Sequence, residues 1–280
     1  MDTSGTVSSA RQAGNSDALE HLARVGLIAY GIVHLLVAWL ALQLAWGGGG
    51  GEGSADQSGA MATLAEQPFG KPLLWVLAIG LLALAVWQLA ELFRQVPGLR
   101  GTGKTKKKAV TGSVKSVSKT VVYVVLAITA IKYATGGGES SSSQQQQTVA
   151  GVFGWPAGRL LVGLAALVLI GVGAYHVRKG LTKHFLKEID TAQATAGQRR
   201  VIERLGQVGY PAKGVALALV GGLLGWAAIT FDPEKARGLD GALRTLLDAP
   251  FGKVLLTLVA VGIAAFGVFA FFRARYPQRT

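Results

Sequence analysis

The chain has 280 residues, of which half are hydrophobic and only 15% are charged, and it contains no cysteine. Soluble domains carry about 25% charged residues, so this composition argues against a soluble protein. The lack of cysteine excludes disulfides, thiolate metal sites and cysteine nucleophiles. Lysine and arginine outnumber aspartate and glutamate by 28 to 15, a balance that has to be compared with the apolar segments before it suggests nucleic acid.

The chain opens with a polar segment, residues 1–21, that lacks the basic start and the cleavage site of a signal peptide. We therefore expect the first apolar segment to be retained as a membrane helix. Six apolar segments follow one another, at residues 25–44, 73–90, 120–131, 160–177, 214–231 and 254–272. Five of them have 18 to 20 residues without a charged side chain, and about 20 helical residues cross a hydrocarbon core of roughly 30 Å.

The third apolar segment is shorter than the others. It has 12 residues between Lys119 and Lys132, and it can cross a membrane only if both lysines extend their ammonium groups to the interfaces. With this segment included, the pattern predicts an all-α integral membrane protein with six transmembrane helices.

Basic residues are concentrated in alternate loops. The segments 94–119 and 178–204 hold eight and seven of them, and with both ends of the chain the total is 20, against six in the other loops. Because cytoplasmic loops carry the excess of lysine and arginine, we expect both termini to be cytoplasmic. The same distribution accounts for the net charge of +13 without any nucleic acid.

An internal repeat relates the two ends of the chain. The sequence PFGK occurs at 68–71 and again at 250–253, and the surrounding blocks match at offsets of 182 and 183 residues. A weaker middle copy, offset by 88 or 89, keeps the pattern Pro-x-Gly-basic-x-Leu. The residues of this motif are Pro68, Gly70, Lys71, Pro156, Gly158, Arg159, Pro250, Gly252 and Lys253. We expect it to be a structural turn; a ligand-binding loop is the alternative.

Each copy indicates a hairpin of two membrane helices with a short interfacial helix between them. Ser58 or Asp240 can cap that short helix, whose apolar side would face the outer interface. Proline then ends the short helix, glycine permits the turn, and the basic residue marks the headgroup level. Three hairpins of one topology predict a pseudo-threefold bundle, with rotations of roughly 120° about the membrane normal.

The chain is thus expected to divide into repeats and basic linkers. The segments are a polar N-terminal segment 1–21, repeats 22–93, 117–180 and 205–272, basic cytoplasmic linkers 94–116 and 181–204, and a basic tail 273–280. We expect the basic, glycine-rich segment 98–119 to be mobile or attached to anionic headgroups. The polar low-complexity stretches at 47–53 and 136–147 are expected to be flexible outer loops.

The outer copies, with "ARVGLIAYG" at 23–31 and "APFGK" at 249–253, resemble an integral membrane family known as "domain of unknown function 1206", found mainly in actinobacteria. The resemblance covers residues 22–272 and implies repeated two-helix units in a bacterial plasma membrane. It implies no activity. The middle copy departs from the pattern, with Thr120 where glycine is expected and Ala157 where phenylalanine is expected.

A possible nucleotide-binding motif is present at 98–105, where GLRGTGKT matches the phosphate-loop pattern letter for letter. Such a loop needs a strand before it and a helix whose amides face the phosphates after it. Here a membrane segment precedes the motif and a cationic run follows it, so we expect a solvated basic loop and no nucleotide.

The candidate polar site inside the apolar segments consists of His34, Gln88 and His176. Gln88 and His176 share a repeat position, and lipid cannot satisfy an amide or an imidazole. We expect both to point into the bundle or into an inner vestibule; hydration at the headgroups, without a shared site, is the alternative. For the His34 side chain, a structural role and a functional role are the two alternatives. We identify no group of residues for a metal, a cofactor or a catalytic triad.

The sequence leaves three classes of function. The first is a non-enzymatic membrane scaffold or partner-binding protein, and the alternative is a small transporter or channel for an apolar or lipid-like solute at the repeat interface. An enzyme or a redox-cofactor binder is the least favoured class. The expected partners are the lipid bilayer, anionic headgroups that meet the basic cytoplasmic loops, and another membrane protein, without nucleic acid or nucleotide.

Overall fold

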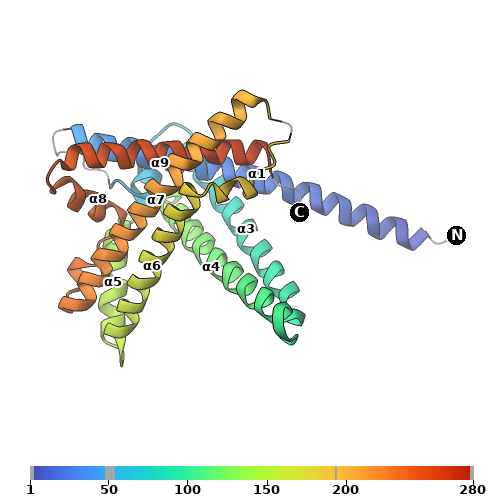
Figure 1. Ribbon diagram of the computed structural model, residues 1–280, viewed down its shortest axis with the longest axis horizontal. Helices are drawn as coiled ribbons and strands as arrows, with labels where there is room; N and C mark the ends of the chain where they lie inside the picture. Colours follow the sequence, from blue (N-terminus) through green and yellow to red (C-terminus); the bar gives the residue numbers. More distant parts are fainter. Residues whose placement is uncertain (1–2, 48–53, 193, 278–280) are drawn as a thin grey trace. The chain divides into compact units, whose positions relative to one another are not determined.

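Figure 1 shows a computed structural model of the chain, which describes residues 3–47, 54–192 and 194–277, without the side chains of 3–23, 91, 104 and 108. The regular elements of this described part are helices, with one isolated bridge between Ile189 and Pro277. In chain order they are α1 (Thr3–Trp46), α2 (Gln57–Ala65), α3 (Gly70–Leu99), α4 (Gly103–Ala134), α5 (Ser141–Phe153), α6 (Gly158–Leu181), η1 (His184–Glu188), α7 (Ala196–Thr230), η2 (Pro233–Lys235), α8 (Leu239–Leu247) and α9 (Gly252–Arg275).

Six of these helices are long and apolar enough to cross a membrane: α1 from Arg24, α3, α4 from Thr105, α6, α7 and α9. This confirms the prediction of an all-α, multi-pass membrane protein. The third apolar segment belongs to the 32-residue helix α4. Its missing length is therefore supplied by polar helical turns before Thr120, and the segment is not a short helix.

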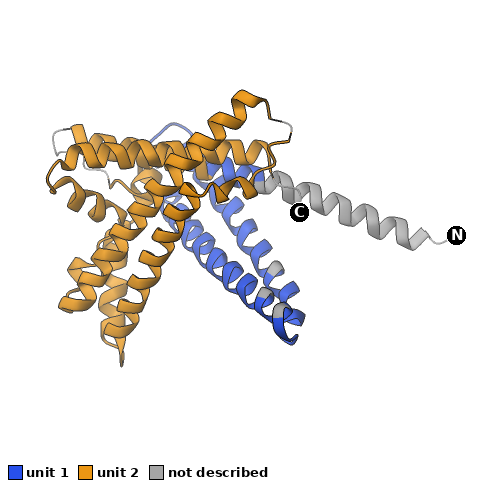
Figure 2. Ribbon diagram, in the orientation of Figure 1, with its two compact units in different colours: residues 1–29, 65–137 blue, residues 30–64, 138–280 orange. Residues whose placement is uncertain are grey.

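The chain divides into two compact units, shown in Figure 2. One consists of residues 1–29 and 65–137, and the other of residues 30–64 and 138–280. Helix α1 contributes residues to both.

The first unit is built on the hairpin of α3 and α4. The two helices touch near the turn, where a Cβ on Gly98 would lie 2.9 Å from the Cβ of Ala109 and one on Gly112 would lie 2.2 Å from Gln95 Oε1. In the same unit, a Cβ on Gly26 of α1 would lie 2.8 Å from Leu84 of α3. The absence of side chains on these glycines therefore sets how closely the helices approach one another.

The basic segment between the first two repeats is helical over most of its length; that 98–119 is mobile or attached to anionic headgroups stays a prediction. Helix α3 continues to Leu99 and α4 begins at Gly103, which has a φ of +58°. The phosphate-loop pattern at 98–105 thus lies in a tight turn between two helices and has a helix, not a strand, before it. The side chain of Lys104 lies outside the described residues.

The second unit packs α6, α7 and α9 through glycines at which backbones touch. A Cβ on Gly173 of α6 would lie 2.6 Å from the carbonyl oxygen of Gly214 on α7, and one on Gly209 would lie 2.6 Å from the amide nitrogen of Phe266 on α9. In α1, a Cβ on Gly31 would lie 2.8 Å from the carbonyl oxygen of Gly267. Glycines at these positions thus let the helices pack closely.

The turn that leads into the second long helix has the same backbone in all three repeats. Phe69, Ala157 and Phe251 have left-handed angles, with φ of 65°, 60° and 61°. In each turn the next residue, a glycine, donates its amide hydrogen to the carbonyl three positions back, at 2.8–2.9 Å. With proline second and the left-handed residue third, the pattern is that of a type II turn. The residue before the glycine, and not the glycine itself, therefore has the left-handed backbone angles.

The glycine of the turn provides space for the backbone of the preceding helix. A Cβ on Gly158 would lie 1.9 Å from the carbonyl oxygen of Val152, and one on Gly252 would lie 1.9 Å from that of Leu247. Each long helix can therefore begin directly against the backbone of the short helix before it.

The segment predicted as a basic linker at 181–204 is folded. Phe185 of η1 is fully buried beside Tyr210 and Phe269, whose rings lie 5.4 Å away. The amide of Asp190 donates to the carbonyl of Tyr276 at 3.0 Å. We call residues 184–190 the inner strap, because they connect the end of α6 to the end of α9 and would lie on the inner side in the predicted orientation.

Candidate functional site

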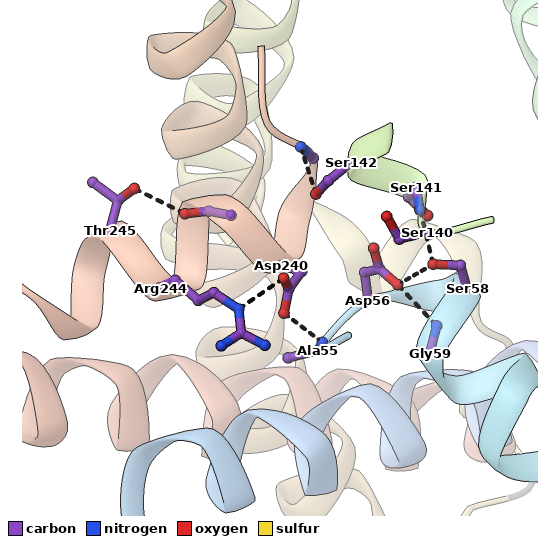
Figure 3. A network of polar contacts seen from close by, with 12 residues as sticks. Ala55, Asp56, Ser58, Gly59, Ser140, Ser141, Ser142, Asp240, Arg244 and Thr245 are labelled. Carbon is purple, nitrogen blue, oxygen red and sulfur yellow. Dashed lines mark hydrogen bonds and ion pairs between the residues drawn. The ribbon is translucent and has the colours of Figure 1, made fainter. Parts of the chain in front are cut away.

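The short helices α2, α5 and α8 begin next to one another in the second unit, as Figure 3 shows. Ser58 of the first repeat accepts the amide hydrogen of Ser141 of the second, at 2.9 Å. Ser142 of the second repeat accepts that of Gly238 of the third, at 3.2 Å. Asp240 of the third repeat accepts that of Ala55 of the first, at 2.8 Å.

These three bonds form a closed circuit, which we call the outer ring. Each repeat supplies one side-chain acceptor, which bonds the next repeat, and one backbone donor, which bonds the preceding repeat, with the third repeat followed by the first. The ring satisfies amides at or just before the start of each short helix, where no intrahelical partner exists. Head-to-tail contacts that close after three members have the sense of a threefold rotation, although the rotation that relates the whole hairpins stays a prediction.

Asp56 caps α2 and lies fully buried next to the outer ring. Its Oδ1 accepts from the Ser58 hydroxyl at 2.5 Å and from the Gly59 amide at 2.9 Å, while its Oδ2 has no hydrogen-bond partner among the described atoms. Asp240 bonds Arg244 as well as Ala55 and does not cap its own helix. The prediction that Ser58 or Asp240 caps the short helix is therefore wrong.

The apolar residues of the short helices do not face lipid as predicted. Met61 and Leu243 are 1% and 0% exposed, so they are packed inside the protein. The low-complexity stretch at 136–147 is partly ordered as well, because α5 begins at Ser141. Of the stretch at 47–53, all but Gly47 lies outside the described residues.

The basic position of the turn motif has different surroundings in different repeats. Arg159 donates to the carbonyls of Ala228 and Ile229 at 2.7 Å, at the end of α7, whereas Lys71 and Lys253 are exposed. The prolines Pro68, Pro156 and Pro250 come three residues after the short helices end, so they shape the turn and do not terminate those helices. With Gly70, Gly158 and Gly252, the motif is a turn in all three copies.

His34 is buried on α1, with 6% of its surface exposed. Its Nδ1 lies 2.8 Å from the carbonyl oxygen of Tyr30 on the same helix. Its ring lies 4.2 Å from that of Tyr30 and 5.0 Å from that of Phe266 on α9. Nδ1 of this imidazole thus has its partner within α1, and the ring contacts two aromatic rings; whether His34 is structural or functional stays a prediction.

Lys213 of α7 lies beside the same rings. Its ammonium donates to the Tyr30 hydroxyl and lies 4.9 Å from the centre of the Tyr30 ring and 4.4 Å from that of Phe266. The aromatic faces stabilise the cation. The described side chains place no carboxylate in an ion pair with Lys213.

His176 lies at the inner end of α6, facing α7. Its Nδ1 lies 2.8 Å from the carbonyl oxygen of Val172, and its ring is stacked on that of Tyr210 at 5.9 Å. Tyr210 in turn meets Phe266 edge-on at 5.1 Å. His34 and His176 therefore do not touch, but both contact one continuous aromatic cluster made of Tyr30, Phe266 and Tyr210.

Glu188 of the inner strap interacts with the charged side chains next to this cluster. It pairs with Lys179 at 2.5 Å and Arg273 at 3.6 Å, and it accepts from the Tyr210 hydroxyl at 2.7 Å. Burial by itself would raise the pKa of Glu188, but the charges of Arg273 and Lys179 and the hydrogen bonds hold that pKa below its ordinary value. Glu188 is thus a carboxylate at neutral pH and fixes the strap to three helices.

Gln88, the remaining candidate, lies half-buried on α3 in the first unit. Whether it shares a cavity with the two histidines stays a prediction. Within the described residues, no three His, Asp or Glu side chains are grouped so that they could hold a metal ion.

Sequence reasoning missed Lys213, Tyr30, Tyr210 and Glu188, although one signal was available. Lys213 and Lys132 are the basic residues that belong to neither set of loops. When the first repeat is aligned with the third, Lys213 falls at the position of Tyr30. In the structure these two equivalent positions contact each other.

Comparison with known proteins gives the same division of the chain. The profile described as Domain of Unknown Function (DUF1206) matches three times, at residues 25–93, 114–183 and 208–277. The uncharacterized protein YxxB of Bacillus subtilis (strain 168) is 29% identical over 262 residues, which cover 94% of this chain and 92% of that protein. No solved structure matches the chain. Since the three matches cover most of the sequence and coincide with its three repeats, the chain belongs to the DUF1206 family.

Proposed function

We propose that the protein is a non-enzymatic scaffold of the bacterial plasma membrane, with both termini in the cytoplasm, which holds a partner membrane protein. The observation that carries this proposal is the outer ring. Its three bonds tie the repeats together on one side through buried serine and aspartate side chains, so the outer ends of the second unit form a fixed platform.

Backbone contacts between the helices support the same conclusion. Alternating access moves repeats or bundles against one another, but Gly173 with Gly214, and Gly209 with Phe266, bring main chains into direct contact. Any sliding at these points would force backbone atoms together. Such rigidity suits a scaffold better than a transporter of apolar or lipid-like solutes.

The exposed face of α6 is the surface we propose for the partner. Leu160, Leu164 and Leu167 are 74%, 60% and 67% exposed and follow one another at helix spacing. Gly171 continues the stripe, and no atom lies within 4 Å of the place its Cβ would take. Small residues on an open face let a second membrane helix approach closely.

Photo-crosslinking in intact cells tests this surface. A photoreactive residue at Leu164 or Leu167 is expected to give a discrete protein adduct. The same residue at Val162, which is 4% exposed on the same helix, is the matched control and should give none. Adducts to lipid alone from every exposed position, or solute flux through the purified protein in vesicles, would contradict the scaffold.

The orientation is tested separately by labelling introduced cysteines, which is clean because the chain has none of its own. Cysteines at Gln147 and Arg237, both exposed, should react with an impermeant reagent added outside intact cells. A cysteine at the exposed Lys107 should react only after the cells are opened. Labelling of Lys107→Cys in intact cells would reverse the proposed topology, and with it the contact between basic inner segments and anionic headgroups.

A further inference from the structure

The charges around the aromatic cluster do not balance. Lys179, Arg273 and Lys213 contribute three positive charges, and Glu188 contributes one negative charge, which Lys179 and Arg273 share. Lys213 is left with a hydroxyl and two ring faces. An ionisable group in a membrane helix normally pairs with an opposite charge, so the partner of Lys213 is expected to come from outside the described chain.

Hydrogen-bond donors are also in excess at this point. An ammonium has three donors, and one of those on Lys213 is used by the Tyr30 hydroxyl. Because that hydroxyl accepts from Lys213, its own hydrogen is available to donate elsewhere. Lys213 and Tyr30 therefore offer three donors at one place, between the rings of Tyr30 and Phe266. Several donors and a positive charge suit the oxygens of a phosphate.

The depth of Lys213 indicates where such a phosphate would come from. Lys213 directly precedes the uncharged segment 214–231 and is at the end of it that lies closest to the basic inner segments. Lysines at such positions keep the apolar stem in hydrocarbon and extend the charge to the headgroup level. Lys213 as a whole is half-buried, so part of the residue is open to a headgroup while acyl chains lie along the apolar helices.

We propose that Lys213 and Tyr30 form a binding site for the phosphate of an anionic phospholipid of the inner leaflet. The ammonium neutralises the phosphate, the Tyr30 hydroxyl donates to it, and the Phe266 ring excludes water from one side. The site is distinct from the partner surface on α6, and each can fail without the other.

The experiment measures lipid bound to the full-length purified protein by native mass spectrometry, with phosphatidylglycerol and phosphatidylcholine as competing probes. The wild type is expected to retain phosphatidylglycerol preferentially. Lys213→Met, which keeps the stem and removes the charge, should retain about fivefold less, the effect of one lysine near an anionic surface. Tyr30→Phe should lose part of the preference for phosphatidylglycerol. Lys213→Arg, which keeps the positive charge, should retain the preference that Lys213→Met loses.

The matched control is Lys187→Met, which removes an exposed charge from the inner strap and should leave the preference unchanged. A thermal unfolding midpoint measured with and without phosphatidylglycerol keeps the test informative if a variant is less stable, since the lipid should raise the midpoint of the wild type and not that of Lys213→Met. An unchanged preference in Lys213→Met would overturn the proposal. Inorganic phosphate that raises the wild-type midpoint as much as the lipid does would assign the site to a soluble anion and overturn the lipid assignment.

Discussion

Phe251 and Gly252 both shape the turn before α9, whereas the sequence motif pointed to the glycine. Phe251 adopts the left-handed backbone conformation, which costs a non-glycine residue roughly 1–2 kcal/mol. Because Gly252 has no side chain, α9 can start against the carbonyl of Leu247. Phe251 is 84% exposed, and aromatic residues are favoured at membrane interfaces.

Gly252→Ala is therefore expected to destabilise the protein by about 2 kcal/mol, the usual cost of overpacking. The added methyl group would lie 1.9 Å from a carbonyl oxygen of the preceding helix. Thermal unfolding in detergent, followed by circular dichroism, measures the change. Gly171→Ala is the control, since nothing lies within 4 Å of its added carbon, and it should be neutral or slightly stabilising. Equal midpoints for the two variants would contradict this account of the turn.

Glu188 makes the stability dependent on pH in a defined direction. Its pKa in the folded protein lies below the ordinary value of 4.5, because of Arg273, Lys179 and the hydrogen bonds that overcome the effect of burial. A carboxyl group with a lowered folded pKa contributes stability above its unfolded pKa, and this contribution is lost as the pH falls through the folded pKa.

We expect the wild type to lose stability below pH 4.5 more steeply than Glu188→Gln does. At pH 7 the variant should be less stable by about 1 kcal/mol, a figure reduced for the partial exposure of the carboxylate. Unfolding midpoints measured at several pH values between about 3 and 7 on the two proteins give the comparison. Parallel pH profiles would show that Glu188 is not the titrating group.

At the scale of elements, the outer ring determines how the short helices are held. Asp240 accepts from the amide of Ala55, a residue that is 1% exposed. A buried amide that loses its acceptor costs about 1–3 kcal/mol. Asp240 also bonds Arg244 on its own helix, so its removal affects both the ring and α8.

Asp240→Ala should accordingly speed hydrogen exchange at residues 54–59, far along the chain from the substitution, as well as at the start of α8. Asp248→Ala, on an exposed residue just after the same helix, is the control and should leave residues 54–59 unchanged. Hydrogen exchange followed by mass spectrometry resolves the two segments. Exchange that increases only within α8 would show that the ring does not hold the first repeat.

The long helices, the repeats and the turns could be predicted from the sequence, because the length of an apolar segment and a short motif are local properties. The outer ring could not, since its bonds join residues 83 to 185 positions apart and depend on how the helices pack. The order within the segment 181–204 was missed for a similar reason. Basic composition suggested exposure, but the buried ring of Phe185 and the Glu188 contacts order the inner strap.

At the scale of the whole molecule, the closed order of the outer ring is what a threefold arrangement of the repeats would produce. The exposed leucines Leu73, Leu161 and Leu255 occupy equivalent positions in the three repeats. If rotations of roughly 120° relate the hairpins, these three positions define an equilateral triangle. This holds whatever the spacing of the helices.

Pairs of spin labels on cysteines at these three positions should therefore give three equal distances. Double electron–electron resonance spectroscopy in detergent measures them. Labels at positions 73 and 161, 161 and 255, and 73 and 255 are needed, each in a separate double variant. Three clearly different distances would exclude the pseudo-threefold bundle and leave the ring as a local feature of the short helices.

The long-range contacts also have a consequence for the order of synthesis. Ala55 and Ser58 emerge from the ribosome early, but the acceptor for Ala55 lies 185 residues later. The inner strap likewise makes contacts with residues that are synthesised late. They are Arg273, at the end of the last helix, and Tyr276, just beyond it. Until then the amide of Ala55 lacks the acceptor that it has in the folded protein. The outer and inner contacts can therefore be completed only after the last repeat has been synthesised.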